Sequence, residues 1–185
     1  MLVEDASDAG EFLDRANGFA PLRAVRVPPG ASLKRVRIVG GDYDQQELAE
    51  VLDGFEGRAS DIATRHDGRV VKHIGDEVMF VAVDPNADCE IALELVEAVE
   101  TLGRGVRPRG AVAFGPVLQR AGDYYGPVVN LASRVAELAV PYEILVTEEL
   151  VHAAEHWSLA FKPAGRRMLK GFEEPVSLWE LQRDD

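Results

Sequence analysis

The sequence is poor in cysteine, in basic residues and in long apolar runs, and each shortage excludes a class of protein. Cys89 is the one cysteine among 185 residues, so neither a disulfide scaffold nor a cysteine-based zinc site is expected. No apolar run reaches the roughly 18 residues that a membrane helix needs. Residues 1–13 are acidic, unlike the basic front of a targeting signal. We therefore expect a cytoplasmic protein with no membrane partner.

Basic residues are outnumbered, since 20 Lys and Arg stand against 32 Asp and Glu, which gives a formal net charge of -12. A chain this acidic repels the phosphate backbone of DNA and RNA, so nucleic acid is not an expected partner. What the sequence does contain is an ordinary core composition, with 46% hydrophobic and 28% charged residues. Composition and length together predict one folded domain, with or without a small appendage.

The apolar spacing alternates between helical and strand periods along the chain. A helix is predicted from Asp44 onward, because Asp44 and Glu47 have the form of a capping box ahead of an apolar stripe. Segments 69–74 and 77–83 predict a tight hairpin around Gly75-Asp76. Further helices are predicted over 87–102 and 128–138. Further strands are predicted over 109–118, with an interruption at Gly115-Pro116, over 143–147, around Phe161 and over 176–181. Tight hairpins exclude an all-parallel sheet, so the predicted fold is an α+β sandwich with helices on a mainly antiparallel sheet.

Several polar residues have both a structural and a functional explanation. Lys72 on a strand is ordinarily a solvent-facing side chain, and Asp76 in a tight turn is ordinarily turn chemistry. Asn130 and Arg134 are four residues apart and share one helix face, which also suits a solvated polar stripe. Lys170, followed by glycine, is typical of an ordinary turn between strands. Taken singly, none of these residues indicates a function.

Three separated motifs resemble those of the class III nucleotide cyclases. They are residues 68–80 (GRVVKHIGDEVMF), 120–134 (RAGDYYGPVVNLASR) and 168–176 (MLKGFEEPV), which follow the family's order and spacing. The likeness runs from Gln45 to Leu181, and it implies a ferredoxin-like cyclase sandwich. We assign residues 33–182 to a cyclase domain and residues 1–32 to a separate N-terminal segment.

The resemblance implies an adenylate cyclase of cyclic nucleotide signalling, which converts ATP into 3′,5′-cyclic AMP and pyrophosphate by attack of the 3′-hydroxyl on the α-phosphorus. Lys72 matches the family's lysine at the purine edge, and Asp123 matches its partner at the adenine amino group. A lysine donor and a carboxylate acceptor suit adenine, whereas guanine turns a carbonyl toward the carboxylate. ATP is therefore the expected substrate, in preference to GTP.

The resemblance also implies roles around the ribose and the phosphates. Asn130 matches the asparagine that orients the ribose, Arg134 the arginine that stabilises the pentavalent phosphorus, and Lys170 the lysine at the terminal phosphates. Asp76 matches the second of two aspartates that hold a pair of divalent metals, Mg²⁺ or Mn²⁺. Each active site of the family is shared between two chains, so a homodimer is implied, with a heterodimer as the alternative.

The family's first metal aspartate has no counterpart in this sequence. The family strand ends in Phe-x-Asp-Leu/Ile-x-Gly, whereas residues 36–41 are VRIVGG, which puts Arg37 in the position of the aspartate. A guanidinium there repels divalent cations, since one unit-charge contact at about 4 Å is worth roughly 4 kcal/mol at an effective dielectric near 20. A register shift offers Asp42 or Asp44 instead, although Asp42 suits a turn and Asp44 suits a helix cap.

Arg37 therefore leaves several alternatives open. The chain is either a cyclase with impaired metal binding or a catalytically silent domain that binds nucleotide or dimerises in a regulatory role. A reading-frame change upstream of Gln45 is a further explanation, because the stretch before it is unusually rich in arginine, valine and proline.

Overall fold

The computed structural model describes residues 25–26, 32–39, 44–101, 106–154 and 158–184, with the backbone alone for 25–26 and 32–39. Asp42 and nearly all of the predicted N-terminal segment lie outside these ranges. Four helices are found in the described ranges: α2 (Gln45–Arg65), α3 (Pro85–Glu100), α4 (Pro127–Leu138) and α5 (Glu148–Ala153). None of these helices has both the length and the apolar character that a bilayer crossing requires.

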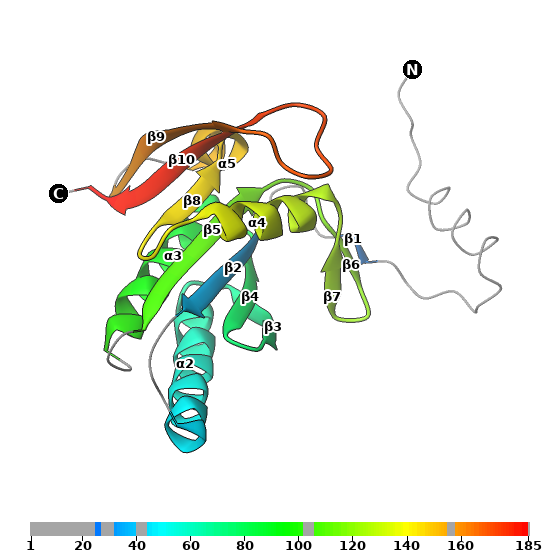
Figure 1. Ribbon diagram of the computed structural model, residues 1–185. Helices are drawn as coiled ribbons and strands as arrows, with labels where there is room; N and C mark the ends of the chain where they lie inside the picture. The colour runs from blue at the N-terminus through cyan, green and yellow to red at the C-terminus, as the bar shows by residue number, and fades with distance from the viewer. Residues whose placement is uncertain (1–24, 27–31, 40–43, 102–105, 155–157, 185) are drawn as a thin grey trace.

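The centre of the molecule is a seven-stranded sheet (Figure 1). Its strands are β2 (Ser32–Val39), β3 (Arg69–Ile74), β4 (Glu77–Ala82), β5 (Arg107–Phe114), β8 (Ile144–Thr147), β9 (Leu159–Arg167) and β10 (Val176–Arg183). They lie in the order β3-β4-β2-β5-β8-β10-β9. Neighbours are antiparallel except β5 and β8, which are parallel. The run from β2 to β5 is the β-α-β-β-α-β unit of ferredoxin-like folds, so the predicted α+β sandwich with a mainly antiparallel sheet is confirmed.

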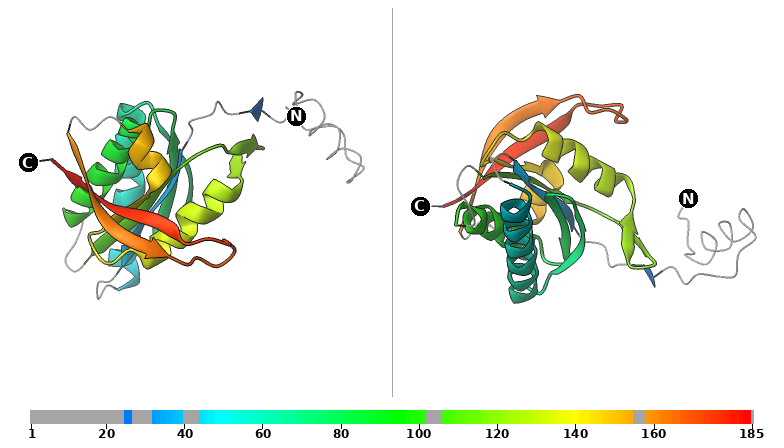
Figure 2. Two further views of the ribbon diagram at one scale, coloured as in Figure 1. Left: turned by 90° about the horizontal axis from the view of Figure 1, so that it is seen from above. Right: turned by 60° about the horizontal axis from the view of Figure 1, so that its bottom comes forward.

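Helices cover both faces of the sheet (Figure 2). On one face α2, α3 and α5 enclose a buried cluster that includes Phe55, Phe80, Ile91 and Leu150. Cys89 belongs to this cluster and is fully buried. On the other face α4 packs on β2 and β5. The sheet is therefore the middle layer, and α4 stands alone on the side that carries the second and third predicted motifs.

The start of α2 follows from local chemistry. Asp44 accepts hydrogen bonds from the backbone N–H groups of Gln46 and Glu47, and Glu47 accepts one from the backbone N–H of Asp44. These bonds satisfy amides that have no partner inside the helix. The predicted capping box is confirmed, and Asp44 serves as the helix cap.

A smaller three-stranded sheet, in the order β1-β6-β7, extends beyond the main one (Figure 1). Its strands are β1 (Val25–Arg26), β6 (Leu118–Arg120) and β7 (Asp123–Tyr125). The predicted interruption at Gly115-Pro116 is confirmed, because β5 ends at Phe114. The prediction that 109–118 is one strand is wrong, because β5 and β6 belong to different sheets. The chain bends at Gly115, where a Cβ would lie 2.8 Å from the side chain of Val128, so close packing of α4 requires glycine there.

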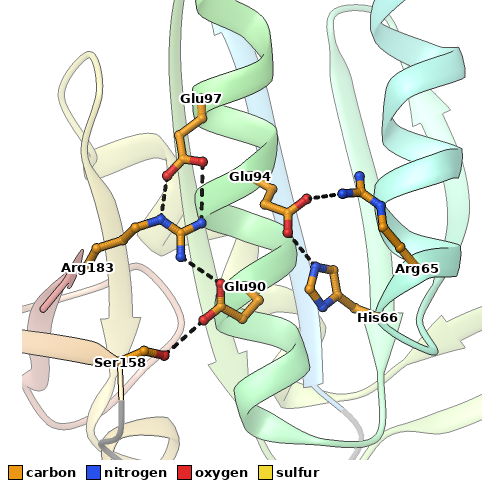
Figure 3. A network of polar contacts seen from close by, with 7 residues as sticks. All are labelled: Arg65, His66, Glu90, Glu94, Glu97, Ser158 and Arg183. Carbon is orange, nitrogen blue, oxygen red and sulfur yellow. Dashed lines mark hydrogen bonds and ion pairs between the residues drawn. The ribbon is translucent and has the colours of Figure 1, made fainter.

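Ion pairs connect α3 with the end of α2 and with β10 (Figure 3). Glu94 of α3 lies 3.0 Å from Arg65 and 2.6 Å from His66, at the end of α2. Two further glutamates of α3 bind the last strand, β10. The face of α3 opposite the core thus joins the end of α2 to the C-terminal end of the described chain.

Candidate functional site

Lys72 and Asp123, predicted to recognise the purine base, lie in direct contact. Lys72 Nζ donates to Asp123 Oδ2 at a distance of 2.5 Å. Lys72 lies on β3 of the main sheet and Asp123 begins β7 of the small sheet. Their side chains are 41% and 31% exposed, so both remain reachable from solvent. The structure thus gathers one cationic donor and one anionic acceptor at one accessible point.

The electrostatics of this pair favour an ionised aspartate. The hydrogen bond from Lys72 lowers the pKa of the Asp123 carboxyl, while partial burial raises it and the N–H of Tyr124 lowers it. That N–H donates to Asp123 Oδ1 at 2.9 Å. Both carboxylate oxygens therefore have a donor, and Asp123 acts as an acceptor rather than as an acid.

Asp76 lies in the tight turn between β3 and β4, as predicted. Gly75 takes a positive φ of 62° there, a conformation that glycine adopts at little cost. Asp76 is half-buried. The backbone of Arg37 pairs with Glu77, the residue after Asp76, so position 37 is next to the turn, where the family resemblance expects an aspartate.

The described residues contain no group of three or more His, Cys, Asp or Glu side chains arranged to hold a metal. Of the two substitutes that a register shift offers, Asp44 is engaged as a helix cap through its Oδ1 atom. Asp42 lies outside the described residues. Asp76 is therefore the one predicted metal ligand whose side chain the structure describes.

Asn130 and Arg134 lie on the solvent side of α4. The helix buries Val128, Ala132 and Val135 against the sheet, which leaves the opposite face for the two polar residues. Asn130 is exposed, and the Arg134 side chain is 41% exposed and lies 3.3 Å from Glu137. An exposed ion pair within one helix is weak, so the contact with Glu137 holds Arg134 only loosely.

Lys170 lies in the turn between β9 and β10, where it is exposed. Its neighbours fix the turn: Leu169 is 6% exposed and packs in the same cluster as Val135 of α4, with Phe172 against it. Gly171 takes a φ of 89°. The turn that carries Lys170 is therefore anchored next to α4.

A hollow of about 420 Å³ opens between the end of β5, the start of α4 and the β9–β10 turn. Its lining is largely apolar and consists of Phe114, Gly115, Pro116, Pro127, Val128, Leu131, Glu149 and Phe172. An apolar hollow with one carboxylate does not suit a triphosphate, whose charges require donors or cations. The lining of this hollow therefore does not match the phosphate groups of a nucleotide.

Arg69 and Tyr124 belong to the same constellation but were not predicted from the sequence. Arg69 Nη2 donates to the Tyr124 hydroxyl at 2.9 Å, and its guanidinium carbon lies 5.1 Å from the centre of the ring. Tyr124 is 5% exposed. Arg69 and Tyr124 are close in sequence to Lys72 and Asp123 and connect the same two strands, β3 and β7. Their contact therefore helps to hold these strands together at the site.

Known proteins that are similar to this chain in sequence are nucleotide cyclases. The family model described as adenylate and guanylate cyclase catalytic domain matches residues 40–182. An adenylate cyclase of Glutamicibacter nicotianae is 37% identical over 129 residues, covering 70% of this chain and 32% of that protein. A pH-sensitive adenylate cyclase of Mycobacterium tuberculosis is 35% identical over 189 residues, covering 99% of this chain and 46% of that protein. The chain thus spans between about a third and a half of the length of these relatives.

Solved structures agree on the fold. The adenylyl cyclase CyaB from P. aeruginosa has a TM-score of 0.76 at 20% identity, covering 89% of this chain and 98% of that one. The catalytic core of a rhodopsin-guanylyl cyclase with converted specificity, in complex with ATPαS, has a TM-score of 0.79 at 18% identity, covering 88% of this chain and all of that one (100%). With the motifs, the paired Lys72 and Asp123 and the family match over most of its length, this chain belongs to the adenylate and guanylate cyclase catalytic domain family.

Proposed function

We propose that this chain, through a cyclase domain over residues 33–182, converts ATP into 3′,5′-cyclic AMP and pyrophosphate. The observation that carries the proposal is the contact of 2.5 Å between Lys72 and Asp123. Adenine offers a ring nitrogen as acceptor and an amino group as donor, and this pair offers the complementary donor and acceptor. The relatives named adenylate cyclase support the same substrate.

The remaining proposed residues act on the ribose and the phosphates. Asn130 orients the ribose so that its 3′-hydroxyl faces the α-phosphorus, which makes the attack intramolecular and oriented. Arg134 neutralises the charge that builds on the phosphate oxygens, and Lys170 binds the pyrophosphate that leaves. Loss of such a contact to the developing charge costs about 10²–10³-fold in rate.

Members of this family use divalent metal ions, and we propose Asp76 as the ligand that this chain supplies to Mg²⁺ or Mn²⁺. The described residues do not fit a pair of such ions, because no cluster of three candidate ligands occurs among them and Arg37 stands at the position of the first aspartate.

We further propose that the active unit is a homodimer with shared sites, in which Asp76 of one chain faces Asn130 and Arg134 of a second. The solved adenylyl cyclase from P. aeruginosa supports the fold of each single chain in such a unit. A site that forms between two chains gives a specific activity that rises with protein concentration. A partner of different sequence that supplies the first aspartate is the heterodimeric alternative.

The test is direct. Purified protein incubated with ATP and Mn²⁺ should release cyclic AMP, identified by mass spectrometry, and Arg134→Ala should lower its rate about 10²–10³-fold. Lys162→Ala is the matched control, because it removes a positive charge from the exposed surface of β9 and should leave the rate unchanged. Absence of cyclic AMP at every protein concentration would refute the proposal.

A second function is favoured by Arg37 alone. If a guanidinium at this position prevents metal binding, the chain is a nucleotide-binding or dimerising regulatory domain without turnover. Equilibrium binding of ATP that depends on Lys72, together with an absence of cyclic AMP, would distinguish this function from the enzyme.

A further inference from the structure

Strand β3 contains an irregularity next to Lys72. Val70 pairs with Phe80 and Lys72 pairs with Met79 on β4, so Val71 is an extra residue in β3 with no partner in the ladder. This is a β-bulge. Residues 69 and 72 are three apart and would face opposite sides of a regular strand. Because of the bulge, they pair with Val81 and Met79, which are two apart and share a face.

The packing confirms which side each residue takes. Met79 and Val81 belong to one buried cluster, with Tyr124 in it and Val71 packed against it. Val78 and Phe80 belong to the other cluster, which α2 and α3 cover. Arg69 and Lys72 therefore lie on the face of the sheet that carries β7. Without the extra residue, Lys72 would face α2 and α3 instead.

Each of these two side chains binds one residue of β7. Arg69 holds the hydroxyl of Tyr124 at 2.9 Å, while Lys72 holds Oδ2 of Asp123 at 2.5 Å. Tyr124 in turn donates its backbone N–H to Asp123 Oδ1 at 2.9 Å. The Asp123 carboxylate thus accepts hydrogen bonds from Lys72 and from the backbone of Tyr124. The position of Tyr124 in turn depends on its contact with Arg69.

The strand that carries Asp123 has little stability of its own. Strands β6 and β7 have three residues each, and a hairpin of this size is marginal in isolation. Tyr124 is its buried anchor, at 5% exposure, whereas Tyr125, the next residue, is 50% exposed. The direction of the Asp123 carboxylate therefore depends on how firmly Tyr124 is held.

We propose that Arg69 and Tyr124 are positioning residues for base recognition, and that the Val71 bulge exists to bring Arg69 and Lys72 to one face of β3. The Arg69–Tyr124 contact fixes β7 so that Asp123 meets Lys72 in the geometry that adenine requires. This inference rests on the proposed function for its link to ATP. Neither residue touches the base, and both act through Asp123.

Tyr124→Phe tests the inference, because it removes one hydroxyl and keeps the ring that anchors the hairpin. We expect the KM for ATP to rise roughly fivefold and the preference for ATP over GTP to fall by a similar factor, with kcat within about twofold of its original value. Tyr125→Phe, the matched control on the exposed side of the same strand, should change none of these quantities. Arg69→Met should reproduce Tyr124→Phe, and the double variant should be no worse than either alone.

A second measurement does not need turnover. The pKa of the Asp123 carboxyl, followed by ¹³C NMR, should rise toward its ordinary value in Tyr124→Phe and stay unchanged in Tyr125→Phe, because a loosened Asp123 spends less time against Lys72. If the original protein makes no cyclic AMP, the proposed function fails and this titration still decides the positioning role. An unchanged carboxyl pKa in Tyr124→Phe, or equal effects of the two tyrosine variants, would overturn the inference.

Discussion

Lys72 Nζ lies 2.5 Å from Asp123 Oδ2. This contact joins the main sheet to the small sheet at the point where a base is proposed to bind. Each residue comes from a different sheet, and neither forms the site without the other. The pair offers a donor beside an acceptor, which is the pattern that adenine complements. Guanine presents the reverse pattern on the same edge, with a carbonyl acceptor and a ring N–H donor.

Reversing the pair should therefore reverse the base preference. In the double variant Lys72→Glu and Asp123→Asn, a carboxylate replaces the donor and an amide that can donate replaces the acceptor. We expect the ratio of kcat/KM for ATP to kcat/KM for GTP to fall by roughly 100-fold, measured with both nucleotides under identical conditions. Lys162→Glu, on the exposed part of β9, changes the net charge like Lys72→Glu and should leave the ratio unaltered. A ratio that falls equally in both proteins would contradict the assignment.

The same contact predicts a dependence of stability on pH. The hydrogen bond from Lys72 lowers the pKa of Asp123 in the folded protein, so the folded pKa lies below the unfolded value of about 3.9. The stabilisation is complete above the unfolded pKa and is lost as the pH falls through the folded pKa. Its size is small, because the side chains are 41% and 31% exposed and water screens them.

Lys72→Met should raise the pKa of Asp123 and flatten the loss of stability in acid. The carboxyl pKa is read from ¹³C NMR, and the free energy of unfolding is read from urea denaturation at several pH values below about 5. Asp123→Asn is the companion variant, since it removes the titrating group and should flatten the same part of the curve. An Asp123 pKa that does not move in Lys72→Met would show that Lys72 is not its principal partner.

The elements that the sequence predicted well are those whose signals are local. Asp44 and Glu47 are three residues apart and cap α2 by themselves, and Gly75-Asp76 forms its turn without help from distant residues. The break at Gly115 was predicted, but the assignment of β5 and β6 to different sheets was missed, because it depends on contacts with other elements such as that of Val128 with Gly115. Local patterns predict contacts within an element, whereas the division of strands between sheets depends on packing.

The residues of the site were likewise predicted only in part. Lys72 and Asp123 were identified through the resemblance to a family, and no spacing rule joins residues 51 positions apart. Arg69 was missed, since regular alternation puts it on the face opposite Lys72. The bulge at Val71 puts both residues on the same face. The sequence Val70-Val71 contains no signal that predicts this bulge. The supporting residues of a site are therefore harder to predict than the residues that touch the ligand.

Restoring the aspartate at position 37 should strengthen metal binding. The backbone of Arg37 pairs with Glu77, next to the turn that carries Asp76, so Arg37→Asp would bring a second carboxylate toward the first. We expect affinity for Mn²⁺, measured by electron paramagnetic resonance in the absence of nucleotide, to rise by roughly tenfold or more, because repulsion is replaced by attraction. Release of cyclic AMP should rise in parallel.

Arg166→Asp provides the control for this experiment, since it makes the same change of charge at an exposed position of β9. Its Mn²⁺ affinity should equal that of the original protein. If Arg37→Asp gains no more affinity than Arg166→Asp, then position 37 is not the cause of a metal defect.

The last strand of the sheet is held by Arg183, which binds two glutamates of α3 (Figure 3). Its Nε lies 2.7 Å from Glu97 and its Nη1 lies 2.8 Å from Glu90. Glu90 also accepts from the hydroxyl of Ser158 at 3.2 Å, just before β9. The hydrogen bonds to Glu97 and Glu90 raise the pKa of the Arg183 guanidinium, so Arg183 keeps its positive charge in alkaline solution.

Arg183→Met keeps the aliphatic stem and removes these contacts. We expect a loss of about 1 kcal/mol, because the groups are partly exposed but arranged as a network, and hence a fall in Tm of about 2–4 °C for a chain of this size. The difference from the original protein should shrink in about 1 M salt, which screens exposed charges. Arg167→Met is the control, since its guanidinium contacts the neighbouring carbonyl of Arg166 rather than another element. Equal losses of Tm in the two variants, or a loss that salt does not change, would mean that the stem of Arg183 and not its charge secures β10.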